Sequence, residues 1–194
     1  MKSFGGRKED VDSMERCRIV FSGSGGQGVI TAAVILAEAA VLQEHLNAVQ
    51  SQSYGPEARG GATRSDVILS ADEIFFPKVL QPNVLICLTQ SAYNKYHSIL
   101  RPGGVMLTDP HFVETHRGLD AQRCEIPMYQ AVLDQIGKPV VFNICVLGAL
   151  LGIRPLVAPD SILRVLETRL PGDFLDLNRK ALELGYRLGT DCAV

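Results

Sequence analysis

The chain has 194 residues, 46% of them hydrophobic, and a net charge of −2, which suits one globular α/β domain with a sizeable core. The charge balance lacks the basic footprint of a nucleic-acid-binding protein, and the apolar stretches are too short to span a bilayer. Residues 1–16 lack the apolar core of a signal peptide. We therefore expect a flexible extension over 1–16, a single domain over 17–194 and a cytoplasmic location.

A glycine-rich loop lies between the first predicted strand, at 17–22, and the first predicted helix, at 29–43. Its sequence is Gly23-Ser24-Gly25-Gly26-Gln27-Gly28. A strand, a glycine loop and a helix together direct backbone N–H groups and the positive helix end toward one point, which favours an anion. The alternative is a tight turn that needs glycine only for packing.

The rest of a dinucleotide-binding pattern is missing. A ribose-binding acid is expected roughly 20 residues after the loop, at the end of the second strand. Residues 48–53 contain no carboxylate, and no Gly-Lys-Ser/Thr follows the glycines as a P-loop requires. A standard NAD site and a P-loop are therefore disfavoured.

A second unusual segment follows an extended piece at 48–52, which we expect at a sheet edge or against a partner. Its residues are Ser53-Tyr54-Gly55-Pro56-Glu57-Ala58-Arg59-Gly60-Gly61. Arg59 offers a bidentate contact to phosphate or carboxylate, and the paired glycines permit close approach of a ligand or backbone. The alternative is a surface loop with a solvated Glu57–Arg59 ion pair.

The remaining chain alternates strands and helices before a helical last third. We expect strands at 64–70, 84–88, 105–109 and, more weakly, 124–126, with helices at 90–100, 128–137, 140–151, 160–170 and 174–188. This order predicts a three-layer, doubly wound α/β fold whose mostly parallel sheet has helices on both faces. Ligands in such sheets bind beyond the carboxyl ends of the strands, where the glycine loop lies.

The cysteines predict no metal site. No two of the five lie within four residues of each other, so iron–sulfur and zinc spacings are missing. Cys17, Cys87 and Cys145 sit in apolar runs and are expected in the core. No set of residues predicts catalysis by this chain itself; Asp109, Glu57 and Glu114 are candidate acids or bases that nothing pairs.

Two glycine motifs at this separation give the chain a family resemblance. Residues 23–33 and 50–61 resemble the gamma subunit of 2-oxoacid:ferredoxin (acceptor) oxidoreductases, most closely its 2-oxoglutarate branch. The resemblance covers about residues 17–152. It extends to Pro102-Gly103-Gly104, Asp109, Pro127, Asn143 and Leu147-Gly148-Ala149-Leu150. His45 departs from it, because a glycine is expected after the first helix, and so does Asn83, where an aspartate often stands.

The resemblance implies a non-autonomous subunit of a complex that oxidatively decarboxylates a 2-oxoacid to an acyl-CoA. Thiamine diphosphate, magnesium and iron–sulfur clusters are then expected in the alpha and beta subunits or a ferredoxin-like delta subunit, with ferredoxin or another acceptor taking the electrons. This chain would shape the coenzyme A path and the subunit interface.

The resemblance also implies roles for particular residues. The 23–28 amides and Arg59 would contact an anion such as a coenzyme A phosphate. The other loop or interface candidates are Tyr54, Gly55, Pro56, Glu57, Gly60, Gly61 and Asn143, the last capping a helix or bonding the loop backbone. Alternatives are a pyruvate or branched-chain 2-oxoacid oxidoreductase subunit, a subunit whose glycine loops only pack, and a free-standing nucleotide-binding protein.

Overall fold

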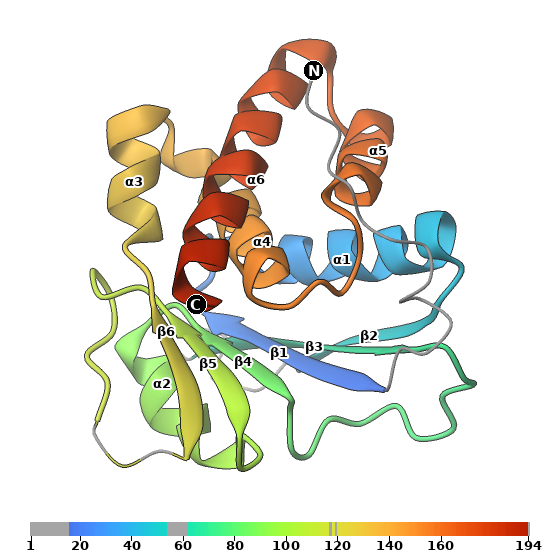
Figure 1. The fold of residues 1–194 in the computed structure, drawn as a ribbon, viewed down its shortest axis with the longest axis vertical. Coiled ribbons are helices and arrows are strands. Elements are labelled where there is room, and N and C mark those ends of the chain that lie inside the picture. The colour runs from blue at the N-terminus through green and yellow to red at the C-terminus, as the bar shows by residue number, and fades with distance from the viewer. Residues whose placement is uncertain (1–15, 54–61, 117, 119, 194) are drawn as a thin grey trace.

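A computed structural model describes residues 16–53, 62–116, 118 and 120–193. The elements of this fold are shown in Figure 1. In chain order they are β1 (Cys17–Gly23), α1 (Val29–Glu44), β2 (Asn47–Ser53), β3 (Thr63–Ser70), β4 (Val84–Cys87), α2 (Gln90–Tyr96), η2 (His97–Ile99), β5 (Gly104–Thr108), β6 (Ala121–Glu125), α3 (Met128–Gln135), η3 (Pro139–Val141), α4 (Phe142–Ile153), α5 (Pro159–Arg169) and α6 (Gly172–Ala193).

The strands form one sheet in the order β2-β3-β1-β4-β5-β6. β1, β4, β5 and β6 pair in parallel, whereas β3 runs antiparallel to both β1 and β2. The connection from β2 to β3 is too short for a crossover helix, which explains the reversed strand. The mostly parallel sheet is thus confirmed, with β3 as its exception and β2 as an edge strand.

Helices cover both faces of the sheet, which confirms the three-layer arrangement. Figure 1 shows α1, α4 and α6 over one face and α2 on the other. Between these helices, every residue of β4 and β5 is buried. The sheet has a hydrophobic core on each face, and alternate residues of β1 belong to different cores. Ile19 and Phe21 face α1, whereas Val20 faces α2. The apolar runs in the sequence reflect burial on both faces.

Helices α4 and α6 approach so closely that glycine is required along their contact. Gly148 and Gly152 on α4 lie against the α6 backbone, and Gly185 and Gly189 on α6 lie against the α4 backbone. A Cβ atom at any of the four would overlap a carbonyl oxygen of the other helix. This contact fixes the helical last third, including the predicted buried helix α4, over the sheet.

A carboxylate at the C-terminal end of α1 binds the N-terminus of α5 and holds the two helices together. Glu44, the last residue of α1, accepts hydrogen bonds through Oε1 from Ala158 N (2.9 Å) and Ser161 Oγ (2.6 Å). A negative charge is favourable at a helix N-terminus. An Arg169–Glu38 ion pair joins the same two helices.

Helix α1 ends in a left-handed residue, although the residue is not glycine. His45 has φ 56° and ψ 26°, and Leu46 N donates to the Ala40 carbonyl at 2.9 Å. The turn at which the resemblance predicts a glycine is therefore formed here with a histidine. A side chain with a Cβ is disfavoured in this conformation.

We predict that His45→Gly raises the free energy of unfolding by about 0.5–1 kcal/mol, because glycine adopts the left-handed conformation without the Cβ penalty. Urea unfolding of the wild type and the variant measures this difference. The control is His45→Ala, which keeps the Cβ and should bring no gain. Equal gains in both variants would show that the histidine ring, and not the backbone, sets the cost.

The described residues include no helix that is both long and apolar enough to cross a membrane.

Candidate functional site

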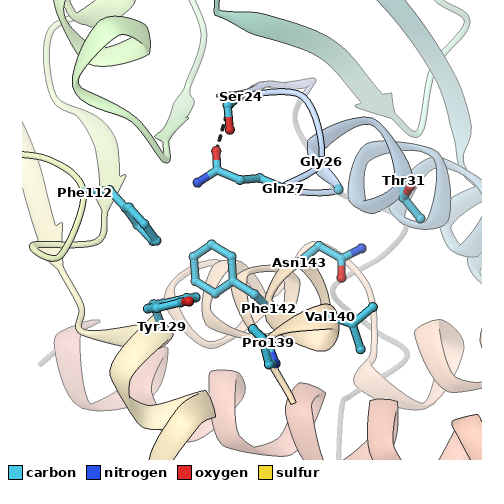
Figure 2. Close-up of a pocket in the computed structure, with 11 residues that line it drawn as sticks. Ser24, Gly26, Gln27, Thr31, Phe112, Tyr129, Pro139, Val140, Phe142 and Asn143 are labelled. Carbon is cyan, nitrogen blue, oxygen red and sulfur yellow. Dashed lines mark hydrogen bonds between the residues drawn. The ribbon is translucent and has the colours of Figure 1, made fainter. Parts of the chain in front are cut away.

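The glycine loop is fixed to the sheet by the side chain of Gln27. Gln27 Oε1 accepts from the Ser24 N–H (2.8 Å), and Gln27 Nε2 donates to the Leu88 carbonyl (3.0 Å), directly after β4. Figure 2 shows the first of these bonds closing the loop on itself. Gln27 therefore joins the carboxyl ends of β1 and β4 and gives the loop a defined shape.

The loop leads into the N-terminus of α1, whose properties favour binding of an anion. The cap residue Gly28 is left-handed (φ 70°) and gives no side-chain hydrogen bond, and the first turn of α1 contains no acidic residue. The first N–H groups of a helix have no partner within it, and the helix dipole adds positive potential there. No acidic side chain in the first turn of α1 offsets this positive potential.

Three aromatic rings form a wall opposite the loop. Phe112 follows β5, Tyr129 lies in the first turn of α3, and Phe142 begins α4. The Phe112 and Tyr129 rings are 5.0 Å apart, and they lie 5.8 and 5.6 Å from the Phe142 ring. These are distances of favourable aromatic contact. Figure 2 shows the three rings gathered on one side, facing the loop.

A cavity of about 610 Å³ lies between the loop and the aromatic wall. This is within the usual size of a small-molecule site. The residues that line it are Ser24, Gly26, Gln27, Gly28, Thr31, Phe112, Tyr129, Pro139, Val140, Phe142 and Asn143. It lies at the carboxyl ends of the strands, as the sequence predicts. One side offers backbone donors and the other an apolar surface, so the cavity suits an anionic ligand with a planar or apolar part.

The structure brings only some of the predicted site residues together. Of the loop 23–28, all but Gly23 and Gly25 line the cavity together with Asn143, whose side chain packs against Gly28. Asn143 does not cap α4, because the cap position is Val141 and it receives no side-chain hydrogen bond. The Ser24 N–H already bonds Gln27. The residues Tyr54, Gly55, Pro56, Glu57, Arg59, Gly60 and Gly61 lie outside the described residues, and their roles stay predictions.

Sequence reasoning missed the aromatic wall. Phe112 and Tyr129 each follow the carboxyl end of a parallel strand within four residues, at the edge where ligands bind. In a chain with only seven Phe and five Tyr, aromatic residues at two such positions are a usable signal. The contribution of Phe142 could not be read in this way, because it comes from the packing of α4 beside them.

Burial makes two core cysteines poor acids. It raises the pKa of Cys87 and of Cys145 from 9.0 to about 12 in each case. Both are buried as predicted, whereas Cys17 is partly exposed. A thiol with such a pKa stays protonated at neutral pH and is not a nucleophile. We found no group of three or more His, Cys, Asp or Glu placed to hold a metal ion in the described ranges.

These thiols should make the protein sensitive to alkali. Between pH 9 and the folded-state pKa, the unfolded chain releases thiol protons that the folded chain keeps, so the free energy of unfolding falls as pH rises. Each such thiol should contribute about 1.4 kcal/mol per pH unit. We predict a shallower fall for Cys87→Ala than for the wild type, from urea unfolding at about pH 8 and about pH 10. Identical slopes would contradict this.

Comparison with known proteins identifies the family. Residues 18–188 match the model of the pyruvate ferredoxin/flavodoxin oxidoreductase family. The 2-oxoglutarate synthase subunit KorC of Methanocaldococcus jannaschii is 41% identical over 91% of this chain and 95% of its own length. The pyruvate synthase subunit PorC of Methanothermobacter marburgensis is 29% identical over 87% of this chain and 94% of its own.

A solved structure agrees in both fold and sequence. The gamma subunit of a keto/oxoacid ferredoxin oxidoreductase from Geobacter sulfurreducens superposes with a TM-score of 0.81 and 39% identity, covering 90% of this chain and 99% of that one. The fold and the sequence relatives therefore define an α/β oxidoreductase subunit. The chain belongs to the pyruvate ferredoxin/flavodoxin oxidoreductase family.

Proposed function

We propose that this chain is the gamma subunit of a thiamine diphosphate-dependent 2-oxoglutarate:ferredoxin (acceptor) oxidoreductase, which converts 2-oxoglutarate and coenzyme A to succinyl-CoA. The higher identity to the KorC relative than to the PorC relative, 41% against 29%, supports the 2-oxoglutarate branch. Pyruvate and branched-chain 2-oxoacids are the alternative substrates. The partners would be the alpha and beta subunits, which with a ferredoxin-like delta subunit would hold the thiamine diphosphate, magnesium and iron–sulfur clusters.

Within that complex, we propose that the cavity binds part of coenzyme A. The observation that carries this assignment is the pairing of an uncompensated helix N-terminus with an aromatic wall across one cavity. Coenzyme A combines phosphate groups, a purine ring and an apolar arm, so each side of the cavity has a chemical match. Helix N-termini bind phosphate, and aromatic side chains offer faces for stacking a ring.

The test is steady-state kinetics of the assembled complex with Arg59→Ala in this chain. Arg59 is the side chain predicted to share the anion with the loop, so its loss should raise the coenzyme A KM about tenfold, the usual order for a charged hydrogen bond. The KM for 2-oxoglutarate should not change, because that substrate reacts at the thiamine centre. The matched control is Arg101→Ala, an exposed arginine just before the amino end of β5, whereas the cavity lies at the carboxyl ends of the strands.

Two other readings make different predictions for the same experiment. A subunit that serves only for assembly would turn over normally with Arg59→Ala. A free-standing nucleotide-binding protein would bind NAD, FAD or S-adenosylmethionine tightly as the isolated chain. The absence of an acid over 48–53 counts against the second reading.

A further inference from the structure

Asp109, the first residue after β5, is fully buried behind the aromatic wall. Its Oδ1 accepts the His111 N–H (2.9 Å) and its Oδ2 accepts the Tyr129 N–H (2.7 Å). Both oxygens are thus bonded to backbone groups of segments some twenty residues apart in sequence. Asp109 is not among the residues that line the cavity, so a direct contact with ligand is not its role.

The two bonds join the elements that carry the wall. The His111 bond belongs to a tight turn in which Phe112 N and Val113 N donate to the Asp109 carbonyl, both at 3.0 Å. The Tyr129 bond reaches the first turn of α3, whose cap residue Pro127 gives no side-chain hydrogen bond. The Asp109 carboxylate therefore takes the place of a cap for α3 and fixes this helix to the turn after β5.

Contacts between aromatic rings link the two segments that Asp109 joins to the lining of the cavity. The His111 ring stacks on the Tyr129 ring at 4.9 Å, and Phe112 meets Tyr129 edge-on at 5.0 Å. Phe112 and Tyr129 both line the cavity. A shift of the turn relative to α3 would therefore separate the two rings or tilt them out of the wall.

Burying the Asp109 carboxylate costs free energy of desolvation, so we expect this side chain to have a specific role. Desolvation raises the pKa of Asp109, while the backbone hydrogen bonds from Tyr129 and His111 oppose that rise. An asparagine of the same shape would avoid the buried charge but has a single acceptor oxygen. Two backbone donors that converge from separate elements require the two oxygens of a carboxylate.

We propose that Asp109 is a positioning residue that sets the Phe112 and Tyr129 rings for the ligand of the cavity. This inference rests on the proposed coenzyme A function and adds to it the residue on which the binding geometry depends. The proposed function places the thiamine chemistry in the other subunits, so the effect of Asp109 should fall on coenzyme A and not on the 2-oxoacid.

The experiment measures the KM for coenzyme A and for 2-oxoglutarate in the assembled complex carrying Asp109→Asn. One N–H bond is lost and an amide N–H₂ faces a backbone donor, so we expect the coenzyme A KM to rise about tenfold with the 2-oxoglutarate KM unchanged. The matched control is Glu44→Gln. Glu44 is also a carboxylate that serves a helix N-terminus, at α5, through Ala158 N and Ser161 Oγ.

The outcomes separate positioning from stability alone. If Asp109→Asn and Glu44→Gln both leave the coenzyme A KM unchanged and lower only the amount of active complex, Asp109 is merely structural and the proposal is overturned. Should Asp109→Asn fail to assemble, Asp109→Ser replaces it, because a hydroxyl can accept one of the two N–H bonds without placing an amide against the other. The same KM shift is expected, and an unshifted KM again overturns the proposal.

A third variant distinguishes this inference from the proposed function. Tyr129→Ala removes a ring of the wall directly and leaves Asp109 in place. If it does not change the coenzyme A KM, the cavity does not bind coenzyme A and both proposals fail together. If Tyr129→Ala raises the coenzyme A KM and Asp109→Asn does not, the cavity assignment holds and the positioning role is wrong.

Discussion

Gly185→Ala is expected to lower the free energy of unfolding by about 3 kcal/mol or more, the upper range for overpacking a core. A Cβ at Gly185 would overlap the Cys145 carbonyl of α4 and lie 2.9 Å from Ala149 N. Because these neighbours are backbone atoms, the helices themselves must separate. The higher helix propensity of alanine, about 1 kcal/mol, is too small to offset this cost.

The control for this prediction lies on the same helix. Gly172 begins α6, and a Cβ there would meet nothing within 4 Å. Gly172→Ala should therefore be neutral or slightly stabilising. Thermal and urea unfolding of the two variants measure the difference. Similar stabilities would mean that α4 and α6 do not approach as closely as the structure shows.

Gly28→Ala is expected to damage the site as well as the fold. Gly28 combines a left-handed backbone (φ 70°) with a neighbour, Asn143, whose Nδ2 would lie 2.7 Å from an added Cβ. The conformational cost alone is about 1–2 kcal/mol. Relieving it requires moving the first turn of α1 or Asn143, both at the cavity. We therefore predict a coenzyme A KM raised about tenfold or more in the assembled complex.

Gly25→Ala is the matched control within the same loop. Gly25 does not have a positive φ, and a Cβ there would meet nothing within 4 Å. The substitution keeps the backbone N–H, so stability and the coenzyme A KM should stay close to wild type. Coenzyme A titrations of the two variant complexes, with urea unfolding of the two chains, make the comparison. Equal behaviour would remove the argument that Gly28 shapes the site.

Much of the fold follows from local patterns. The apolar runs give β1, β4 and β5 within about a residue of their ends, because strands buried on both faces need no polar alternation. The predicted helix 90–100 is instead α2 followed by the 3₁₀ turn η2. The weak strand at 124–126 is β6, at 121–125, where every residue except Cys124 is at least partly exposed. An edge strand of this composition leaves little hydrophobic signal.

The candidate site was only half predictable, for a physical reason. The glycine loop is a local feature, whereas the aromatic wall assembles from three segments that only the packed fold brings together. The pairing of Asp109 with Tyr129 N is equally non-local. The α4–α6 contact did leave a trace, since Gly148 and Gly152, like Gly185 and Gly189, stand four residues apart on one helix face. Close helix packing was the missed interpretation.

The proposed subunit role is tested by purification of the tagged chain from its native host, with an assay for reduction of an artificial electron acceptor. Larger subunits should co-purify with the chain, and reduction should require both 2-oxoglutarate and coenzyme A. Activity with pyruvate or a branched-chain 2-oxoacid instead would keep the family and contradict the substrate branch. A chain that purifies alone and without activity would show that it does not work as a subunit.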